Sequence, residues 1–437
     1  MAEAARRDEA EGAPAGANES LDLGAVLAAA ALVLSAFPVV AAGFSDRPGP
    51  YIVQTYLFWS DLPLIAVGLL RLPDLARRVL ARRLDIGTAL VVLVAALTVA
   101  WAAHPSLRGA LQVLRFLGVA GAVVSTARGG PNVRRLLVGA LAGFTAVQVV
   151  LATMQRTTGG PVGLQSIGEQ SEPLVTIGGS GAPQGTMIHP YLLAGLAMVT
   201  IGVLAAVALR LPHRARACAS LAGVAGVAIG LTYSRAAVVA LAGLVAAILF
   251  AVRSRPTRRA ALTVLAAVLI GSGATALVAG DGWIGRAQES SIGSNLTSGR
   301  GELADQALAI IRRHPLIGVG TGRYVLAVEE DVAVADRSTR LLQPVHAVPL
   351  LLLAEGGVVA AAAVGLLALA LVRTALRAGP AGWALLVGYA PFLLLDHFPV
   401  TFPQGLVITA AWLTALELSS TARSEPAEAD AARLVGS

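Results

Sequence analysis

The stretch PYLLAGLAMVTIGVLAAVAL, residues 190–209, runs for twenty residues without a charged side chain. A helix of about 20 apolar residues is long enough to cross the roughly 30 Å hydrocarbon core of a bilayer. This stretch therefore predicts a transmembrane helix. Further apolar runs predict spans at 22–43, 51–70, 85–102, 108–127, 134–155, 218–233, 236–252, 260–280, 346–372, 381–396 and 402–419, giving about twelve in all.

The composition agrees with a polytopic, all-α membrane protein. Hydrophobic residues make up 56% of the 437 residues and charged residues 14%, and the mean hydropathy is +0.73. A soluble domain of this size does not need so apolar a chain for its core. The net charge of +7 is divided among short clusters that form no continuous basic face, so we expect no nucleic-acid partner. The single cysteine, Cys218, excludes an intramolecular disulfide.

The basic clusters predict the orientation. If the N-terminus is inside, every short inner connection is rich in arginine and the short outer loops carry far fewer, as the positive-inside rule requires. We therefore expect a protein of the cytoplasmic (inner) membrane with both termini in the cytoplasm. The inner clusters contain Arg71, Arg77, Arg78, Arg82, Arg83, Arg128, Arg134, Arg135, Arg210, Arg214, Arg216, Arg253, Arg255, Arg258, Arg259, Arg373 and Arg377.

The chain divides into one membrane domain and two tails. Residues 1–20 and 420–437 are rich in Ala, Glu and Asp with little to bury, so we expect disordered cytoplasmic tails. Residues 21–419 form the transmembrane domain, with two long outer loops at 156–189 and 281–345.

The second outer loop contains a predicted amphipathic helix. Acidic residues in its first turn, basic residues in its last and a proline after it match the helix dipole and a stop signal. Such a helix is expected to lie along the membrane surface or to fold over the mouth of a cavity. Its apolar face consists of Leu303, Ala307, Ile310 and Ile311, its charged ends of Glu302, Asp305, Arg312 and Arg313, and Pro315 follows.

Two arginines are candidate ligands for an anionic group. Arg235 lies between two apolar runs, and facing lipid at that depth would cost at least ~2.5 kcal/mol, so it must face protein, water or a phosphate, or else snorkel to the interface. The neighbouring Ser234 adds a hydroxyl. Arg300 opens the amphipathic helix, where free N–H groups and the dipole favour an anion; a solvated surface arginine is the alternative.

The same outer loop holds further candidates for substrate contact. The glycines of Gly318-x-Gly320-x-Gly322 could let the backbone approach phosphate oxygens, although tight packing at a turn explains them equally well. The remaining candidates are Arg312, Arg313, His314 and Arg323.

His346 is the candidate general base, because an unperturbed histidine with a pKa of roughly 6.5 suits proton transfer at neutral pH. A structural histidine at an interface is the alternative. His189 lies at the outer end of the sixth span, on the same side as His346. Whether it lines the same cavity as His346 is left open by the sequence. Asp396-His397 either orients a base or caps a helix end. Arg115 pairs either with a lipid phosphate or with a carboxylate, for which Asp61 is the most economical partner.

Neither a metal site nor a cofactor is expected. The chain has no HExxH motif, no CxxC motif and no closely spaced Asp pair that would hold a divalent ion. Guanidinium groups would then have to neutralise a pyrophosphate in place of a cation.

Three motifs in order resemble the O-antigen ligase and O-antigen polymerase superfamily. They are Thr232-Tyr233-Ser234-Arg235, the stretch from Ser298-Gly299-Arg300 to Gly318-Val319-Gly320, and His346 followed by Glu355-Gly356-Gly357. The resemblance covers residues 185–360 and elsewhere rests on topology.

The resemblance implies a metal-independent, inverting glycosyltransferase of the GT-C type on the outer face of the cytoplasmic membrane. The donor would be a glycan on polyprenyl pyrophosphate and the acceptor a hydroxyl of a lipid or glycan. Arg235 and Arg300 match the arginines that bind the pyrophosphate, and His346 matches the base. Ala347 departs from the family, which often has Asn there.

Two other functions remain open. A polysaccharide polymerase would use the same donor, and we favour a ligase over it. A transporter of lipid-linked glycans would also need arginines, but transporters usually show paired repeats and broken helices at the midplane, whereas the polar residues here gather outside.

Overall fold

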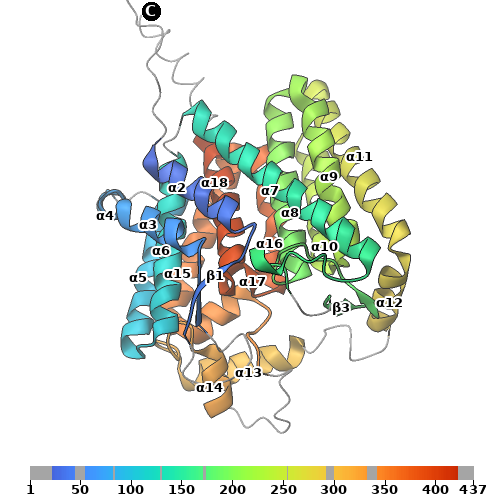
Figure 1. The fold of residues 1–437 in the computed structure, drawn as a ribbon. Helices are drawn as coiled ribbons and strands as arrows, with labels where there is room; N and C mark the ends of the chain where they lie inside the picture. Colours follow the sequence, from blue (N-terminus) through green and yellow to red (C-terminus); the bar gives the residue numbers. More distant parts are fainter. Residues whose placement is uncertain are drawn as a thin grey trace, which may run out of the picture.

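The computed structural model describes residues 22–44, 55–81, 84–127, 130–170, 174–252, 254–291, 300–331 and 342–421. The predicted N-terminal tail, the C-terminal tail from residue 422, the motif residues Ser298 and Gly299 and the inner arginines Arg82, Arg83, Arg128 and Arg253 lie outside these ranges. In the described part, helices run largely side by side in one bundle (Figure 1).

The predicted all-α membrane architecture is confirmed in its main feature. Seven of the described helices are long and apolar enough to cross a membrane, and four shorter ones are apolar as well. A count of twelve crossings stays a prediction. The seven are α5 (Ile86–Ala103), α6 (Leu107–Ala127), α7 (Pro131–Thr158), α8 (Pro190–Arg210), α9 (Ala215–Thr232), α11 (Arg255–Val278) and α15 (Val348–Ala378). The four are α2 (Leu23–Leu34), α3 (Asp61–Leu70), α10 (Arg235–Ala251) and α16 (Pro380–Leu395).

Each predicted span from 85–102 onward coincides with one helix, the last with α18 (Pro403–Thr421). The spans at 22–43 and 51–70 are wrong over part of their length. Residues 40–44 form strand β1 (Val40–Phe44), which pairs antiparallel with β2 (Thr55–Phe58). Pro38 has no N–H to donate to a helix, and the β-branched and aromatic residues of these strands favour a pleated backbone. Hydropathy alone does not register this preference.

A buried ion pair ties the strand pair to the bundle. Arg115 of α6 donates from Nε and from one terminal nitrogen to the two carboxylate oxygens of Asp61, at 2.8 and 2.6 Å. The same terminal nitrogen also donates to the carbonyl of Tyr56 at 2.6 Å. Asp61 accepts the N–H of Phe58 as well. The structural alternative predicted for Arg115 is therefore confirmed, and this arginine stabilises the fold.

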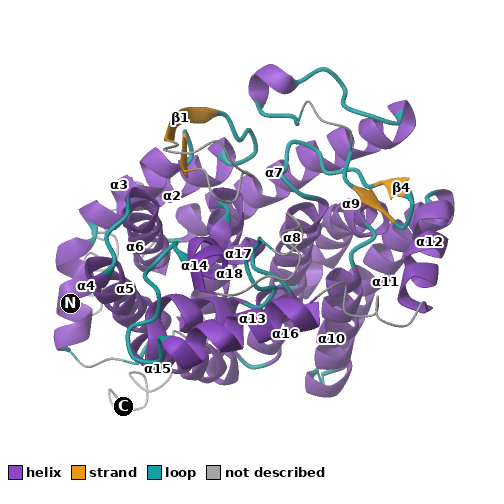
Figure 2. Cartoon of the chain, turned by 90° about the horizontal axis from the view of Figure 1, so that it is seen from below, coloured by secondary structure: helices purple, strands orange, loops and turns teal. Residues whose placement is uncertain are grey.

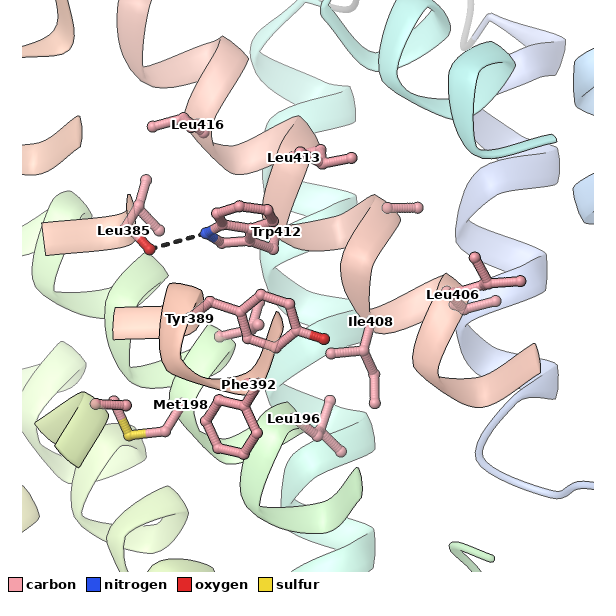
Figure 3. Close-up of a cluster of buried hydrophobic side chains, with 14 of the residues drawn as sticks. Leu196, Met198, Leu385, Tyr389, Phe392, Leu406, Ile408, Trp412, Leu413 and Leu416 are labelled. Carbon is pink, nitrogen blue, oxygen red and sulfur yellow. Dashed lines mark hydrogen bonds between the residues drawn. The ribbon is translucent and has the colours of Figure 1, made fainter. Parts of the chain in front are cut away.

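Helix α8 is the centre of the core. Nearly its whole length is buried, and it packs against α9, α16 and α18. Where α8, α16 and α18 meet, the indole of Trp412 donates to the carbonyl of Leu385 at 2.8 Å, and the rings of Tyr389 and Phe392 stack with centroids 5.5 Å apart (Figure 3).

Three shorter helices cover one end of the bundle. They are α12 (Gly280–Ser291), α13 (Arg300–Arg313) and α14 (Tyr324–Asp331), and they lie at the bottom of Figure 1, opposite the C-terminal end of α18. The sequence predicted only α13. The burial of its expected apolar face is confirmed, since Leu303, Ala307 and Ile310 are at most 1% exposed and the helix packs against α15.

The remaining elements are short. The loop before α8 contains η1 (Gln165–Ile167) and the strand pair of β3 (Thr176–Ile177) with β4 (Ser180–Gly181), which contacts α12. At the other end, α4 (Leu72–Leu80) follows α3, and η2 (Pro212–Arg214) joins α8 to α9. Helix α17 (Phe398–Thr401) lies between α16 and α18.

The glycine loop after α13 is held by backbone contacts with α15. Val319 and Gly320 donate their N–H groups to the carbonyls of Ala354 and Glu355, at 3.0 and 2.9 Å. Gly357 interrupts the helical geometry of α15 with a φ of 60° and a ψ of −155°. A Cβ on Gly318 would stand 2.4 Å from the carbonyl carbon of Glu355. Of the two explanations for these glycines, tight packing is the one found.

We predict that Gly357→Ala destabilises the protein by on the order of 1–3 kcal/mol, because the backbone conformation suits glycine alone. The new Cβ would also stand 2.3 Å from the carbonyl group of Leu316. The matched control in the same helix is Gly365→Ala, whose Cβ would meet nothing within 4 Å. That change should stabilise the helix by roughly 0.5–1 kcal/mol. Thermal unfolding of the purified variants measures the difference, and equal midpoints would contradict the role given to Gly357.

Candidate active site

Three segments that are distant in the sequence meet at the end of the bundle covered by α13. They are the residue pair before α15, the junction between α16 and α17, and the residue that precedes α8. Potential ligand atoms of His346, Asp396 and His397 lie within 4.8 Å of one another. Seen from below, α13 and α17 lie near the middle of this end (Figure 2).

Asp396 shapes the junction between α16 and α17. Its backbone is extended after α16 ends, and its Oδ1 accepts the N–H groups of His397 at 2.7 Å and Phe398 at 3.4 Å. The Nδ1 of His397 lies 2.7 Å from the hydroxyl of Thr401. The carboxylate thus satisfies the free N–H groups at the start of α17, as the capping alternative predicted. It also fixes His397 beside His346.

The imidazole of His346 packs edge-on against that of His397, with centroids 5.0 Å apart. His346 is half-buried, and its Nδ1 has no hydrogen-bond partner among the described residues. His189 completes the group: its ring lies 4.5 Å from that of Phe398, which in turn packs on His397 at 4.6 Å. Of the two alternatives for His189, the structure favours a position near His346, whose charge also influences it.

These histidines are held in the neutral form. Burial, followed by the positive charge of Arg300, lowers the pKa of His346 to about 4. Burial, followed by the influence of His346, lowers the pKa of His189 to about 3, and burial brings the pKa of His397 well below its usual range. Burial raises the pKa of Asp396 to about 7, although backbone N–H groups and Arg300 act against it. At neutral pH the imidazoles can therefore accept protons.

Arg300 supplies the positive charge of the cluster. It is the first residue of α13, it is half-buried, and its charge acts on both His346 and Asp396. Its Nε is buried without a hydrogen-bond partner in the described part of the chain. A desolvated guanidinium nitrogen of this kind is a strong donor to an anion, because it has little water to give up.

Arg235 occupies the first turn of a different helix at the same end of the bundle. It begins α10, which packs mainly against α16, the helix that leads into Asp396. Ser234 is buried and accepts the N–H of Ala237 at 3.2 Å, so its oxygen serves as the N-cap of α10. Tyr233 adopts a φ of 51° and packs edge-on against Trp283 of α12. This local turn positions the guanidinium of Arg235 at the helix start.

Three other predicted residues lie at the far end of α13 from Arg300, and a fourth precedes α14. Arg312 and Arg313 are exposed in the last turn of α13, about 18 Å along the helix axis from Arg300. His314 follows them. Arg323 pairs with Glu330 at 3.8 Å. Of the predicted set, the structure groups Arg300, His346 and His189.

Two arginines that lie near the cluster were not predicted from the sequence. Arg108 and His397 line a small cavity of about 40 Å³, and the charge of Arg108 helps to lower the pKa of His397. Arg286 of α12 donates to the hydroxyl of Tyr191 at 2.8 Å, and that ring packs on His189. Arg108 begins a predicted span at its outer end, where the positive-inside rule expects few arginines. That position was a signal for a functional residue.

The side chains of His346, Asp396 and His397 are also of the types that ligate metals. No sequence motif had indicated that these three residues would lie together. The adjacent charge favours a different occupant. Arg300 acts on His346 and on Asp396, and a fixed cation opposes the entry of a second cation while attracting an anion. The cluster is therefore better suited to phosphate oxygens and a hydroxyl group than to a divalent ion.

A family model described as an O-antigen ligase matches residues 217–365. The matched range begins in α9 and ends in α15, so it contains Arg235, Arg300 and His346 but not His189, Asp396 or His397. No curated protein matches the chain. The match confirms the resemblance seen in the motifs: residues 217–365 of the chain are similar to the O-antigen ligase family.

Proposed function

We propose that this protein transfers a glycan from a polyprenyl pyrophosphate carrier to an acceptor hydroxyl on the outer face of the cytoplasmic membrane, as an O-antigen ligase does. The observation that carries the proposal is the position of Arg300 beside the neutral His346, within the segment that matches the family. One group suits an anionic leaving group and the other suits a hydroxyl proton.

Arg300 and Arg235 are proposed to bind the two phosphates. When the bond between the anomeric carbon and the pyrophosphate breaks, negative charge builds on the leaving oxygen. Donors fixed in advance around that oxygen stabilise the transition state, and they do so most effectively where water is excluded. The planar guanidinium fork matches two phosphate oxygens at once, so the reaction requires no divalent ion.

His346 is proposed to take the proton from the acceptor hydroxyl as its oxygen attacks the anomeric carbon from the face opposite the pyrophosphate. A pKa of about 4 in the empty site keeps His346 neutral and ready to accept a proton. Binding of the pyrophosphate would offset the charge of Arg300, and this raises the pKa of His346 towards the value at which a base works best. His397 and Asp396 would hold the imidazole in position.

A polymerase that extends the glycan on the same donor is the second candidate, because the same cluster would serve it. The two reactions differ in what remains on the carrier when transfer stops. A missing ligase leaves long unligated chains, whereas a missing polymerase leaves single repeat units.

The end that carries His346 is proposed to face outward. Arginines gather at the opposite end, where α7 begins and α8 ends, and the positive-inside rule assigns that end to the cytoplasm.

Cysteine labelling in intact cells checks this orientation. A cysteine in place of the exposed Arg313 on α13 should react with an impermeant reagent, and one in place of the exposed Arg255 should not. The native Cys218 is 5% exposed and should contribute little background. The reverse labelling pattern would overturn both the orientation and the proposed function.

Arg300→Lys should lower turnover at least tenfold, which corresponds to about 1.4 kcal/mol in the transition state. Lysine keeps the charge but loses the planar fork. Transfer from a polyprenyl-pyrophosphate glycan is measured with purified protein in excess chelator, since the proposed reaction needs no metal. The matched control is Arg216→Lys, an exposed arginine at the opposite end. Normal turnover of Arg300→Lys would place the phosphate-binding arginines elsewhere.

His346→Ala should bind the donor normally and transfer its glycan at least roughly a hundredfold more slowly, within the usual effect of losing a general base. Single-turnover transfer and donor binding are measured separately, so that a slower chemical step is distinguished from weaker binding of the donor. The exposed His213 at the other end of the bundle provides the control substitution His213→Ala. A folded His346→Ala protein with near-normal transfer would show that His189 or His397 is the base.

A further inference from the structure

A second cavity lies at the opposite end of the bundle from the candidate active site. Its volume is about 980 Å³, against about 40 Å³ for the space beside His397. Both sites touch α8, one at His189 before its first residue and the other at Arg210, its last. A helix of 21 residues is about 31 Å long, so the two sites are separated by roughly the thickness of a membrane.

The walls of this cavity are apolar. They come mainly from helices α2, α3, α6, α7, α8, α16 and α18, and include Leu32, Leu64, Leu141, Val203, Leu385 and Val407. The volume lies at the upper end of the roughly 300–1,000 Å³ that small-molecule sites occupy. Hydrocarbon chains can pack against such walls without leaving buried polar groups unpaired.

Four arginines also line the cavity. Arg134 and Arg135 belong to the first two turns of α7, and Arg210 and Arg214 lie at the end of α8 and in η2. None of the described residues that line the cavity is acidic. Arg210 donates to the carbonyl of Ser419, which places its side chain at the end of α18. The arginines of α7, α8 and η2 therefore place positive charge in the cavity, where it can pair with an anionic headgroup.

We propose that this cavity binds one anionic glycerophospholipid of the inner leaflet. Its phosphate would lie among the four arginines and its acyl chains along the apolar walls between α7 and α18. Basic pockets between transmembrane helices on the cytoplasmic side are suited to anionic headgroups, and the guanidinium fork fits phosphate oxygens. The site is separate from the proposed transfer reaction, whose pyrophosphate would bind at the other end.

Native mass spectrometry of the delipidated protein tests the proposal. Three probes are added in turn: phosphatidylglycerol, phosphatidylcholine and a polyprenyl phosphate. We expect one phosphatidylglycerol to be retained, and at least tenfold less phosphatidylcholine. Phosphatidylglycerol should also raise the unfolding temperature, because a ligand that binds only the folded state stabilises it.

Two variants locate the site. Arg135→Gln combined with Arg214→Gln removes charges from exposed side chains and should reduce retention at least tenfold without affecting packing. Ala411→Phe, inside the cavity, should exclude the acyl chain. Arg258→Gln combined with Arg259→Gln removes two exposed arginines from the same end that do not line the cavity, and should retain lipid normally.

Three outcomes would overturn the proposal. The first is a wild-type protein that retains no phosphatidylglycerol. The second is equal retention by the Arg135/Arg214 and Arg258/Arg259 double variants. The third is a preference for polyprenyl phosphate, which would assign the cavity to the carrier lipid. Lipid retention is measured without transferase activity, so the result stands apart from the proposed function.

Discussion

The low dielectric of a bilayer drives charged side chains to the ends of helices or into pairs, and both solutions organise this protein. Helix α8 is almost wholly buried, yet a histidine precedes it and an arginine ends it. The buried ion pair between Arg115, in the middle of α6, and Asp61, the first residue of α3, is bidentate. Arg115 also donates to the carbonyl of Tyr56, and Asp61 accepts the N–H of Phe58. The candidate active site and the proposed lipid site accordingly lie at the two ends of the bundle.

At the α13 end, burial and one arginine determine what the cluster can do. Desolvation keeps three imidazoles neutral, and Arg300 adds a positive charge that lowers the pKa of His346 further. An anion bound to Arg300 would offset this charge, and the pKa of His346 would then rise. Under the proposed mechanism, binding of the donor to Arg300 would therefore strengthen His346 as a base.

Much of the helical framework followed from local pattern. The length of each apolar run located the helices from residue 85 onward, and the spacing of Leu303, Ala307 and Ile310 gave the buried face of α13. The first two spans failed because hydropathy measures transfer into an apolar phase and not backbone conformation. Pro38 and the β-branched residues near it marked the change from helix to strand.

The sequence by itself determined the helices from residue 85 onward that form the predicted spans, the clustering of arginines between them, and the three motifs that contain Arg235, Arg300 and His346. Only the tertiary structure decided that Asp396-His397 lies against His346, and that Arg312 and Arg313 lie at the far end of α13 from Arg300. It also decided that the glycines after α13 pack on the break at Gly357. Helix formation depends on neighbours within a few residues, whereas these contacts depend on how α13, α15 and α16 pack together, which no local spacing records.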